Sequence, residues 1–195
     1  MSKIIGITGG VGCGKSTVLS ILEEKYNASV IQADIVGHLV MKSGNDAFES
    51  IVKLFGNKIL DELGEIDRKK LGEIVFVNEE LLQKLNAIIH PAVKEYIKNF
   101  VDDQISKKTE IIVVEAALLI EAGYRDICSE YWYIFASENI RKNRLKASRG
   151  YSDEKIIEIM NNQLSEEEFK EYTDFTIDNN SDVLHLEEQI KRLLM

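Results

Sequence analysis

One stretch near the start of the chain, residues 4–17, constrains the fold more than any other. Residues 4–7 are a short apolar run rich in β-branched side chains, which predicts a buried strand. Val18, Leu19 and Leu22 share one helical face shortly afterwards. The phosphate-binding pattern lies between them and reads Gly9-Gly10-Val11-Gly12-Cys13-Gly14-Lys15-Ser16. A strand, a glycine-rich loop and a helix in this order predict a site for nucleotide phosphates.

Each residue type in this loop suits an anionic ligand. Glycines let the backbone adopt conformations that a Cβ would block, so that N–H groups can turn inward as a nest. The helix that follows adds free N–H groups and the positive end of its dipole. Lys15 can bring an ammonium to the β- and γ-phosphates, and Ser16 can offer a hydroxyl to Mg²⁺. The predicted nucleotide-binding residues here are Gly10, Val11, Gly12, Cys13, Gly14, Lys15, Ser16 and Thr17.

The composition is that of an ordinary globular protein, with 195 residues, of which 45% are apolar and 29% charged. The net charge of −9 argues against a general nucleic-acid binder. No run approaches the ~20 apolar residues that a membrane span needs. Met1-Ser2-Lys3 leads directly into the first predicted strand, unlike a signal peptide. We therefore expect a cytoplasmic protein with no nucleic-acid or membrane partner.

Further predicted strands alternate with helical segments. The strands are expected at residues 29–34, 111–115, 131–135 and 175–177. Apolar residues at helical spacing from Leu81 to Ile105 predict a helical insertion. This order implies an α/β fold with a doubly wound, parallel five-stranded sheet of the P-loop kinase type. The expected nucleotide-binding core comprises residues 1–34, 106–140 and 166–195, and the insertion comprises 35–105.

Polar side chains stand at the ends of three predicted strands. Thr8 ends the first, Asp34 the second and Glu115 the third. Ligands bind outside the carboxyl ends of strands in such sheets, so we expect all three residues at that edge. A carboxylate there could accept the proton of an attacking hydroxyl. Glu115 also closes an apolar run in the manner of a Walker B acid. The residues alone leave the catalytic base open between Asp34 and Glu115.

A basic run occupies residues 141–149. It places five cations in nine residues with no acid between them, namely Arg141, Lys142, Arg144, Lys146 and Arg149. Alone, such a run is more often a solvated helix face. Beside a P-loop it favours a lid, because small kinases use arginines from a mobile segment to neutralise the phosphoryl group and exclude water. We therefore expect a lid over residues 141–165.

Several short motifs follow one another in the order found in the dephospho-coenzyme A kinase family, which the chain resembles over nearly its whole length. The phosphate-binding loop alone is shared by many families, whereas this combination is far more specific. The motifs are Gly9–Ser16, Ala33-Asp34, Asp67-Arg68-x-x-Leu71, His90-Pro91, Leu118-Leu119-Ile120-Glu121, the arginines before Gln163, and Ile177-Asp178-Asn179.

The resemblance implies transfer of the γ-phosphoryl group of ATP to the ribose 3′-hydroxyl of dephospho-CoA, the last step of coenzyme A synthesis. It implies ATP and Mg²⁺ as cofactors, and a CoA-binding role for the helical insertion. It favours Asp34 over Glu115 as catalytic base, with Lys15 and Arg144 also catalytic. The implied substrate-side residues are Thr8, Asp34, Arg68, His90, Leu118 and Glu121, and the further nucleotide-side residues are Arg149 and Asn179.

The chain departs from the family pattern at three places. Gln32 stands where an acid is usual, Ala117 stands where proline is usual, and the spacing from Arg144 to Arg149 is one residue longer.

Two alternatives for the function stay open at this stage. One is another small-molecule or nucleoside monophosphate kinase of the same fold, and the other is an ATP-binding regulatory protein without transfer activity. We expect a monomer or weak oligomer.

Overall fold

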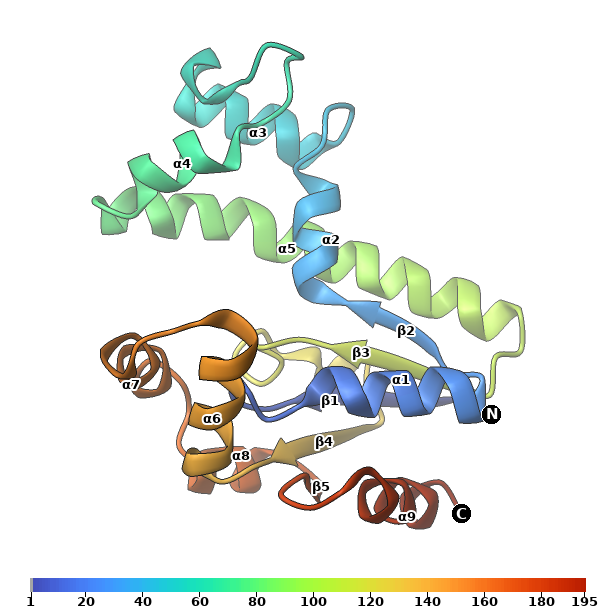
Figure 1. Cartoon of the computed structure of the whole chain (residues 1–195). Helices are drawn as coiled ribbons and strands as arrows, with labels where there is room; N and C mark the ends of the chain where they lie inside the picture. Colours follow the sequence, from blue (N-terminus) through green and yellow to red (C-terminus); the bar gives the residue numbers. More distant parts are fainter. Residues whose placement is uncertain (1) are drawn as a thin grey trace. The chain divides into compact units, whose positions relative to one another are not determined.

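The computed structural model describes residues 2–195, which divide into two compact units. The core unit comprises the described residues up to Val30 together with Asp103–Met195, and the helical unit comprises Ile31–Asp102. Figure 1 traces their elements in sequence order. The strands are β1 (Lys3–Thr8), β2 (Ser29–Gln32), β3 (Ile111–Glu115), β4 (Glu130–Phe135) and β5 (Phe175–Asp178). Their order in the sheet is β2-β3-β1-β4-β5, and β1 pairs in parallel with both β3 and β4.

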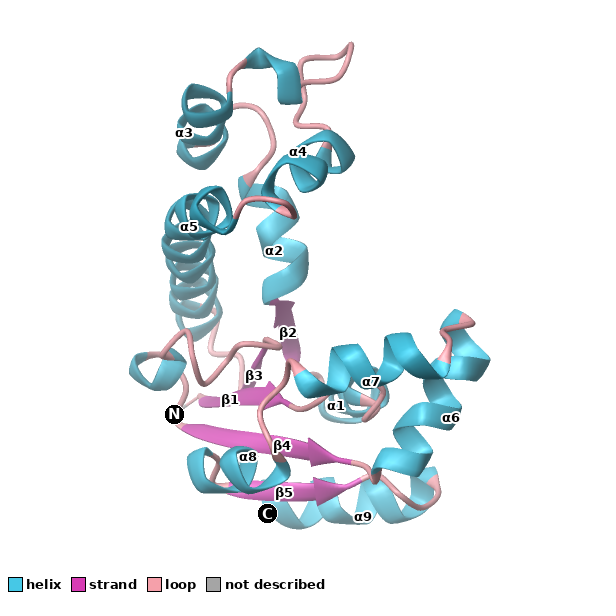
Figure 2. Cartoon of the chain, turned by 90° about the vertical axis from the view of Figure 1, so that its left-hand side faces the viewer, coloured by secondary structure: helices cyan, strands magenta, loops and turns pink. Residues whose placement is uncertain are grey.

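The helices of the core unit are α1 (Lys15–Tyr26), α6 (Glu138–Arg149), α7 (Asp153–Asn161), α8 (Glu166–Tyr172) and α9 (Val183–Leu194). Some of them pack on its sheet, among them α1, α8 and α9. Ile5 and Ile7 of β1 are fully buried and pack in one cluster with side chains of α1 and α9. Phe169 of α8 stacks on Tyr133 of β4, with ring centroids 4.7 Å apart. Figure 2 shows α8 and α9 on opposite sides of β5. The prediction of a parallel five-stranded α/β sheet is confirmed.

Gly6 lies in the middle of β1 at a place where a side chain would not fit. A Cβ at Gly6 would lie 2.8 Å from both Leu119 Cδ2 and Tyr131 Cδ1, well inside van der Waals contact. The chain therefore needs glycine in the middle of β1, where a side chain would separate the sheet from the segment that follows β3. That segment, residues 116–123, consists of turns and buries Leu119 completely.

The helical unit has a hydrophobic core of its own. Its helices are α2 (Ala33–Val40), α3 (Asp46–Phe55), α4 (Arg68–Val75) and most of α5 (Glu79–Ser106), with a 3₁₀ turn at Asn57–Ile59. The core residues are Ile51, Phe55, Ile59, Ile66, Leu71, Val75 and Leu85. Pro91 lies inside α5, which continues to Ser106. Among residues 2–195, no helix is both long and apolar enough to cross a membrane.

The second strand is shorter than predicted. It ends at Gln32, and Asp34 lies in the first turn of α2 instead of on the strand. The cause is the burial pattern. Val36 and Val40 are buried one helical turn apart, whereas Ile35 is half exposed, so the apolar residues after Gln32 follow a helical and not a strand period.

Candidate functional site

The loop from Gly9 to Gly14 connects β1 to α1 in a conformation that requires glycine. Gly9, Gly12 and Gly14 have φ values of 149°, 78° and 92°, in the region that side chains disfavour. Space is also missing at two of them. A Cβ at Gly9 would lie 2.5 Å from the carbonyl oxygen of Ile134, and one at Gly14 would lie 2.2 Å from Nδ2 of Asn179. The glycines that sequence reasoning assigned to backbone freedom therefore also allow close packing.

Lys15 opens α1 and turns back over the loop. Its Nζ donates a hydrogen bond to the carbonyl oxygen of Gly9 at 2.8 Å and lies 3.7 Å from Oε1 of Glu115. Glu115 ends β3 and is placed there by its pairing with Ile7 in the register of β1 and β3. The ammonium is thus held at the mouth of the loop between a carbonyl and a carboxylate. A triphosphate, with more negative charge, would compete for it effectively.

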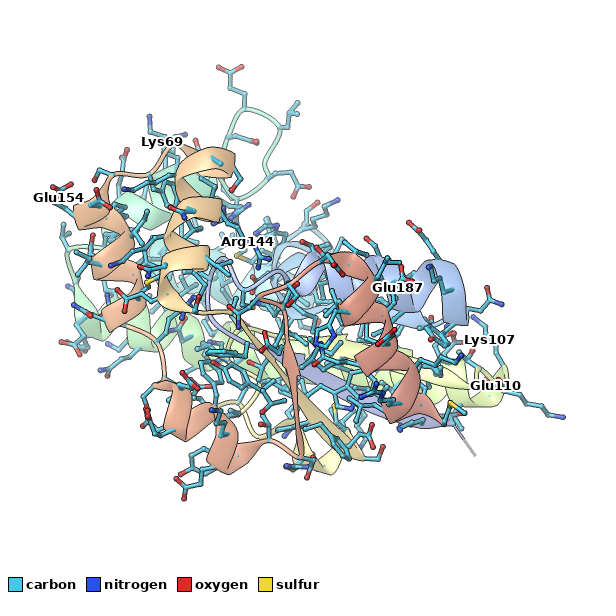
Figure 3. The ribbon with its side chains drawn as sticks, turned by 60° about the horizontal axis from the view of Figure 1, so that its bottom comes forward. Lys69, Lys107, Glu110, Arg144, Glu154 and Glu187 are labelled. Carbon is cyan, nitrogen blue, oxygen red and sulfur yellow. The ribbon has the colours of Figure 1, made fainter. Side chains whose placement is uncertain are left out.

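Two arginines of α6 contact the loop from its outer side. Arg144 donates through Nη1 to the carbonyl oxygen of Cys13 at 3.1 Å and through Nη2 to that of Asn179 at 2.9 Å. Figure 3 shows Arg144 between α6 and the loop before α1. Arg141, one turn earlier, donates through Nε to the carbonyl oxygen of Val11 at 2.8 Å. A guanidinium carries five N–H donors, so both side chains retain donors for phosphate oxygens.

Asn179 lies directly after β5 and is almost fully buried. Its backbone N–H donates to Phe135 at 2.8 Å, and its Nδ2 donates to the carbonyl oxygen of Cys13 at 2.7 Å. The side chain therefore supports the loop that precedes α1. We note that both Asn179 and Arg144 converge on the same carbonyl, that of Cys13.

Cys13 faces the interior of the core unit, with 1% of its surface exposed. Burial raises the pKa of its thiol, although the nearby Lys15 ammonium acts in the opposite direction. The thiolate is thus disfavoured, and Cys13 fits the predicted role of a small packing residue.

Thr8 is likewise buried at the end of β1, and its hydroxyl has no hydrogen-bond partner among residues 2–195.

A cavity of about 320 Å³ lies between α7 and the turns after β3. Leu118 is 51% exposed there, in contrast to the buried Leu119 beside it. The lining residues are Ala117, Leu118, Glu121, Lys155, Glu158, Ile159, Asn162, Gln163, Leu164 and Phe169. The structure therefore brings two predicted substrate-side residues, Leu118 and Glu121, to the inner surface of the predicted lid.

The family follows from comparison with known proteins. The family model described as dephospho-CoA kinase matches residues 3–185. The chain belongs to the dephospho-CoA kinase family. It is 39% identical over 194 residues to the dephospho-CoA kinase of Fusobacterium nucleatum, covering 97% of this chain and 95% of that one. It is 37% identical over 191 residues to that of Carboxydothermus hydrogenoformans, covering 98% of this chain and 92% of that one.

A solved structure of this family has the same fold. The dephospho-CoA kinase from Campylobacter jejuni superimposes with a TM-score of 0.74 at 26% identity, covering 100% of this chain and 96% of that one. Family membership and fold thus agree over the full length described, including the helical unit.

Three predicted substrate-side residues of this dephospho-CoA kinase family member belong to the helical unit. Asp34 lies in α2, Arg68 begins α4 and His90 lies within α5, and all three are exposed. None of these three side chains has a hydrogen-bond or ion-pair partner among residues 2–195. Asp67, the neighbour of Arg68 in the family motif, is instead occupied as the N-cap of α4 and accepts from Lys69 N at 2.9 Å. The backbone hydrogen bonds from Lys70 and Lys69 hold the pKa of Asp67 below its usual value, against a smaller desolvation effect.

Arg149 differs from the other predicted arginine of the lid. It ends α6 and is exposed, and its guanidinium carbon lies 5.8 Å from the ring centre of Tyr151. Its assignment to nucleotide binding stays a prediction.

Sequence reasoning included Arg141 in the basic run but not among the site residues. The available signal was its position three residues before Arg144, which places both on one helical face.

The residues present fit a magnesium ion brought by a nucleotide. Among residues 2–195, no cluster of three or more His, Cys, Asp or Glu side chains could hold a metal unaided. Mg²⁺ commonly needs only one or two protein ligands, and phosphate oxygens and water supply the others. Ser16 is exposed in the first turn of α1, and its hydroxyl makes no hydrogen bond within residues 2–195. That hydroxyl is therefore available as such a ligand.

Proposed function

We propose that this chain transfers the γ-phosphoryl group of ATP to the ribose 3′-hydroxyl of dephospho-CoA, giving coenzyme A and ADP. Membership of the dephospho-CoA kinase family over residues 3–185 carries the proposal. The loop geometry supports it independently, because backbone N–H groups, a helix N-terminus and Lys15 gather where an anion would bind. The transfer requires a triphosphate as phosphoryl donor, and the choice of dephospho-CoA as acceptor rests on membership of the family.

In this proposal Lys15 leaves the Gly9 carbonyl to bind the β- and γ-phosphates, and Arg144 directs its remaining donors to the transferred group. Bound Mg²⁺, with Ser16 as protein ligand, would neutralise charge on the β- and γ-phosphates. Gly10, Val11, Gly12, Cys13, Gly14 and Thr17 complete the nucleotide site through the loop and the first turn of α1. Arg149 and Asn179 belong to its outer parts.

Asp34 is the proposed catalytic base. A ribose hydroxyl is a very weak acid, so the Asp34 carboxylate takes its proton as the oxygen bonds to phosphorus. The bond from the γ-phosphorus to the bridging oxygen then breaks, and its electron pair stays on the β-phosphate of ADP. The exposed side chain of Asp34 has no partner that would hold its charge, so it is free to meet the hydroxyl.

The remaining roles concern the acceptor and the chain's organisation. Thr8, Arg68, His90, Leu118 and Glu121 are proposed to contact dephospho-CoA. We propose residues 35–105 as the acceptor domain, 141–165 as the lid, and 1–34, 106–140 and 166–195 as the nucleotide-binding core. The chain would act in the cytoplasm as a monomer or weak oligomer.

The Asp34→Asn variant tests the assignment of the base, because it keeps the shape of the side chain and removes its basicity. We expect ATP binding close to that of the parent and a loss of most single-turnover transfer to dephospho-CoA. A residual rate should remain, since positioning and charge stabilisation supply much of the catalysis. Asp46→Asn is the matched control, as Asp46 also stands exposed in the first turn of a helix of the same unit. Transfer at a parental rate by Asp34→Asn would exclude Asp34 as base and make Glu115 the next candidate.

A further inference from the structure

Three alternate carbonyl groups of the loop each accept a hydrogen bond from a cationic side chain. Lys15 donates to Gly9 at 2.8 Å, Arg141 to Val11 at 2.8 Å, and Arg144 to Cys13 at 3.1 Å. In a trans peptide the C=O of one residue and the N–H of the next point in opposite directions. These bonds therefore orient the N–H groups of Gly10, Gly12 and Gly14, which make no hydrogen bond within residues 2–195.

Val11 is held more completely than the other two residues. Its N–H donates to Oε1 of Gln163 at 3.0 Å, while its carbonyl oxygen accepts from Arg141 Nε. The same Gln163 oxygen accepts from Nη2 of Arg141 at 2.8 Å. Val11, Arg141 and Gln163 thus close a ring of three hydrogen bonds, which we call the Val11 ring. Both peptide groups of Val11 are fixed by it.

The ring also joins the loop to both ends of one segment. Arg141 lies near the start of α6, and Gln163 follows the end of α7. The segment 141–163 is therefore hydrogen-bonded to Val11 at both of its ends. Gly10 allows the guanidinium to approach, because a Cβ there would lie 2.4 Å from Nη2 of Arg141. A change in the backbone conformation of Val11 would consequently affect the position of both ends of α6–α7. A shift of these helices would likewise affect the backbone of Val11.

We propose that Arg141 and Gln163 are positioning residues of the phosphate site. Through the Val11 ring they hold the Gly12 N–H in the orientation that meets a phosphate oxygen, and they couple that N–H to the position of α6 and α7. Neither residue needs to touch the nucleotide for this effect. The inference rests on the proposed function only in taking the anion to be the triphosphate of ATP.

The test compares ATP·Mg²⁺ binding by calorimetry in Arg141→Met, Gln163→Met and the double variant. Methionine keeps much of the side-chain length and removes the hydrogen bonds. Loss of a hydrogen bond to a charged group predicts a weakening of about ten-fold for each single variant. The double variant should be scarcely worse than either, because removing one member already opens the ring. Arg141→Lys keeps the charge but replaces the forked guanidinium by a single donor nitrogen, so its ATP affinity should fall between those of the parent and Arg141→Met.

Lys142→Met is the matched control, since it removes a cation from the same helix that forms an ion pair with Glu138 on the surface. It should bind ATP like the parent. If it weakens ATP binding as much as Arg141→Met does, the effect is one of general charge and the proposal is wrong. Parental ATP binding by folded Arg141→Met and Gln163→Met, or fully additive losses in the double variant, would also overturn it.

Two readouts separate positioning from a merely structural role. In the nucleotide-free protein the Val11 amide should exchange its hydrogen faster in Gln163→Met, while amides of β1 stay protected. In turnover, the KM for ATP should rise about ten-fold and the KM for dephospho-CoA should not change. If the parent binds ATP but transfers nothing to dephospho-CoA, the proposed function fails, while the binding and exchange results still decide the proposal on the Val11 ring.

Discussion

The phosphate-binding loop and the proposed acceptor-side residues of the helical unit are held in opposite ways. In the loop, the carbonyl groups of Gly9, Val11 and Cys13 are each fixed by a side chain from elsewhere in the core unit or from α1. The side chains of Asp34, Arg68 and His90 are instead exposed and have no hydrogen-bond or ion-pair partner among residues 2–195. In the proposed function, the phosphate-binding loop is therefore organised before nucleotide arrives, whereas Asp34, Arg68 and His90 keep their side-chain polar groups available for dephospho-CoA. Substitutions in the loop should therefore lower turnover or ATP affinity, whereas substitutions of the exposed residues in the helical unit should affect the acceptor side of the reaction.

The largest effect is expected from Lys15→Ala. The Lys15 ammonium should stabilise charge on the β- and γ-phosphates more in the transition state than in the ground state, so turnover should fall by about three orders of magnitude. The fold should survive, since Lys15 is not one of the residues that form the hydrophobic core beside β1. Lys25→Ala is the control, because Lys25 lies in the same helix and pairs with Glu187 at 2.7 Å. Steady-state kinetics with a circular dichroism check suffices, and near-normal turnover by folded Lys15→Ala would refute its role.

Arg144→Ala should have a smaller effect and tests whether one arginine serves both the loop and the phosphates. It removes bonds to the carbonyl groups of Cys13 and Asn179, and we expect kcat to fall more than ATP affinity, by about 100-fold against 10-fold. Lys146→Ala, which breaks only a surface pair with Asp153, should change neither. Equal losses in kcat and affinity would assign Arg144 to the loop alone.

Hydrogen exchange across residues 141–165 should slow when ATP and acceptor bind, and unchanged exchange would contradict the lid.

The pair Asp67→Ala and Arg68→Ala sharpens the contrast within the helical unit. Asp67 caps α4, so its removal should lower the free energy of unfolding, measured by urea unfolding. Because the folded pKa of Asp67 is lowered, its stabilising effect should be present above its unfolded pKa and disappear as the pH falls through the folded value. Arg68→Ala should leave stability unchanged and raise the KM for dephospho-CoA. Loss of stability in both variants alike would show that the motif is structural throughout.

Cys13→Ser should have the smallest effect. The thiol is buried and its pKa is raised, so it offers no reactive thiolate near neutral pH. Serine fits the same space, and turnover should stay within about two-fold of the parent, with a loss in stability of about 1 kcal/mol from burying a hydroxyl. A large loss of kcat without a loss of fold would instead indicate a specific role for the thiol.

Most of the fold could be predicted from local patterns. The apolar runs of β1, β3 and β4 and the spacing of the glycines determine a strand, a loop and a helix over short stretches of sequence. The end of β2 was misplaced because Val36 and Val40 continue an apolar pattern whose helical period becomes clear only over two turns. Pattern reasoning also recognised a helix on both sides of Pro91, which α5 accommodates within its length.

The supports of the loop could not be predicted in the same way. Gln163 and Val11 are 152 residues apart in the chain, and their bond depends on how the segment after α7 packs against the loop that follows β1. Polar contacts of this kind leave no periodic pattern in the sequence. Arg141 stood in the sequence as one cation of a basic run, three residues before Arg144. Its distinction from the exposed Arg149 arises from the direction in which α6 presents each side chain.

Single-turnover phosphoryl transfer tests the central claim most directly. The protein, in excess over ATP labelled in the γ-phosphate, is mixed with dephospho-CoA and Mg²⁺, and the product is located by phosphorus NMR. We predict that the label appears on the ribose 3′-oxygen of coenzyme A, with one ADP released for each transfer. Nucleoside monophosphates in place of dephospho-CoA should accept no label. Label found only in inorganic phosphate, or on a nucleoside monophosphate in preference to dephospho-CoA, would contradict the account.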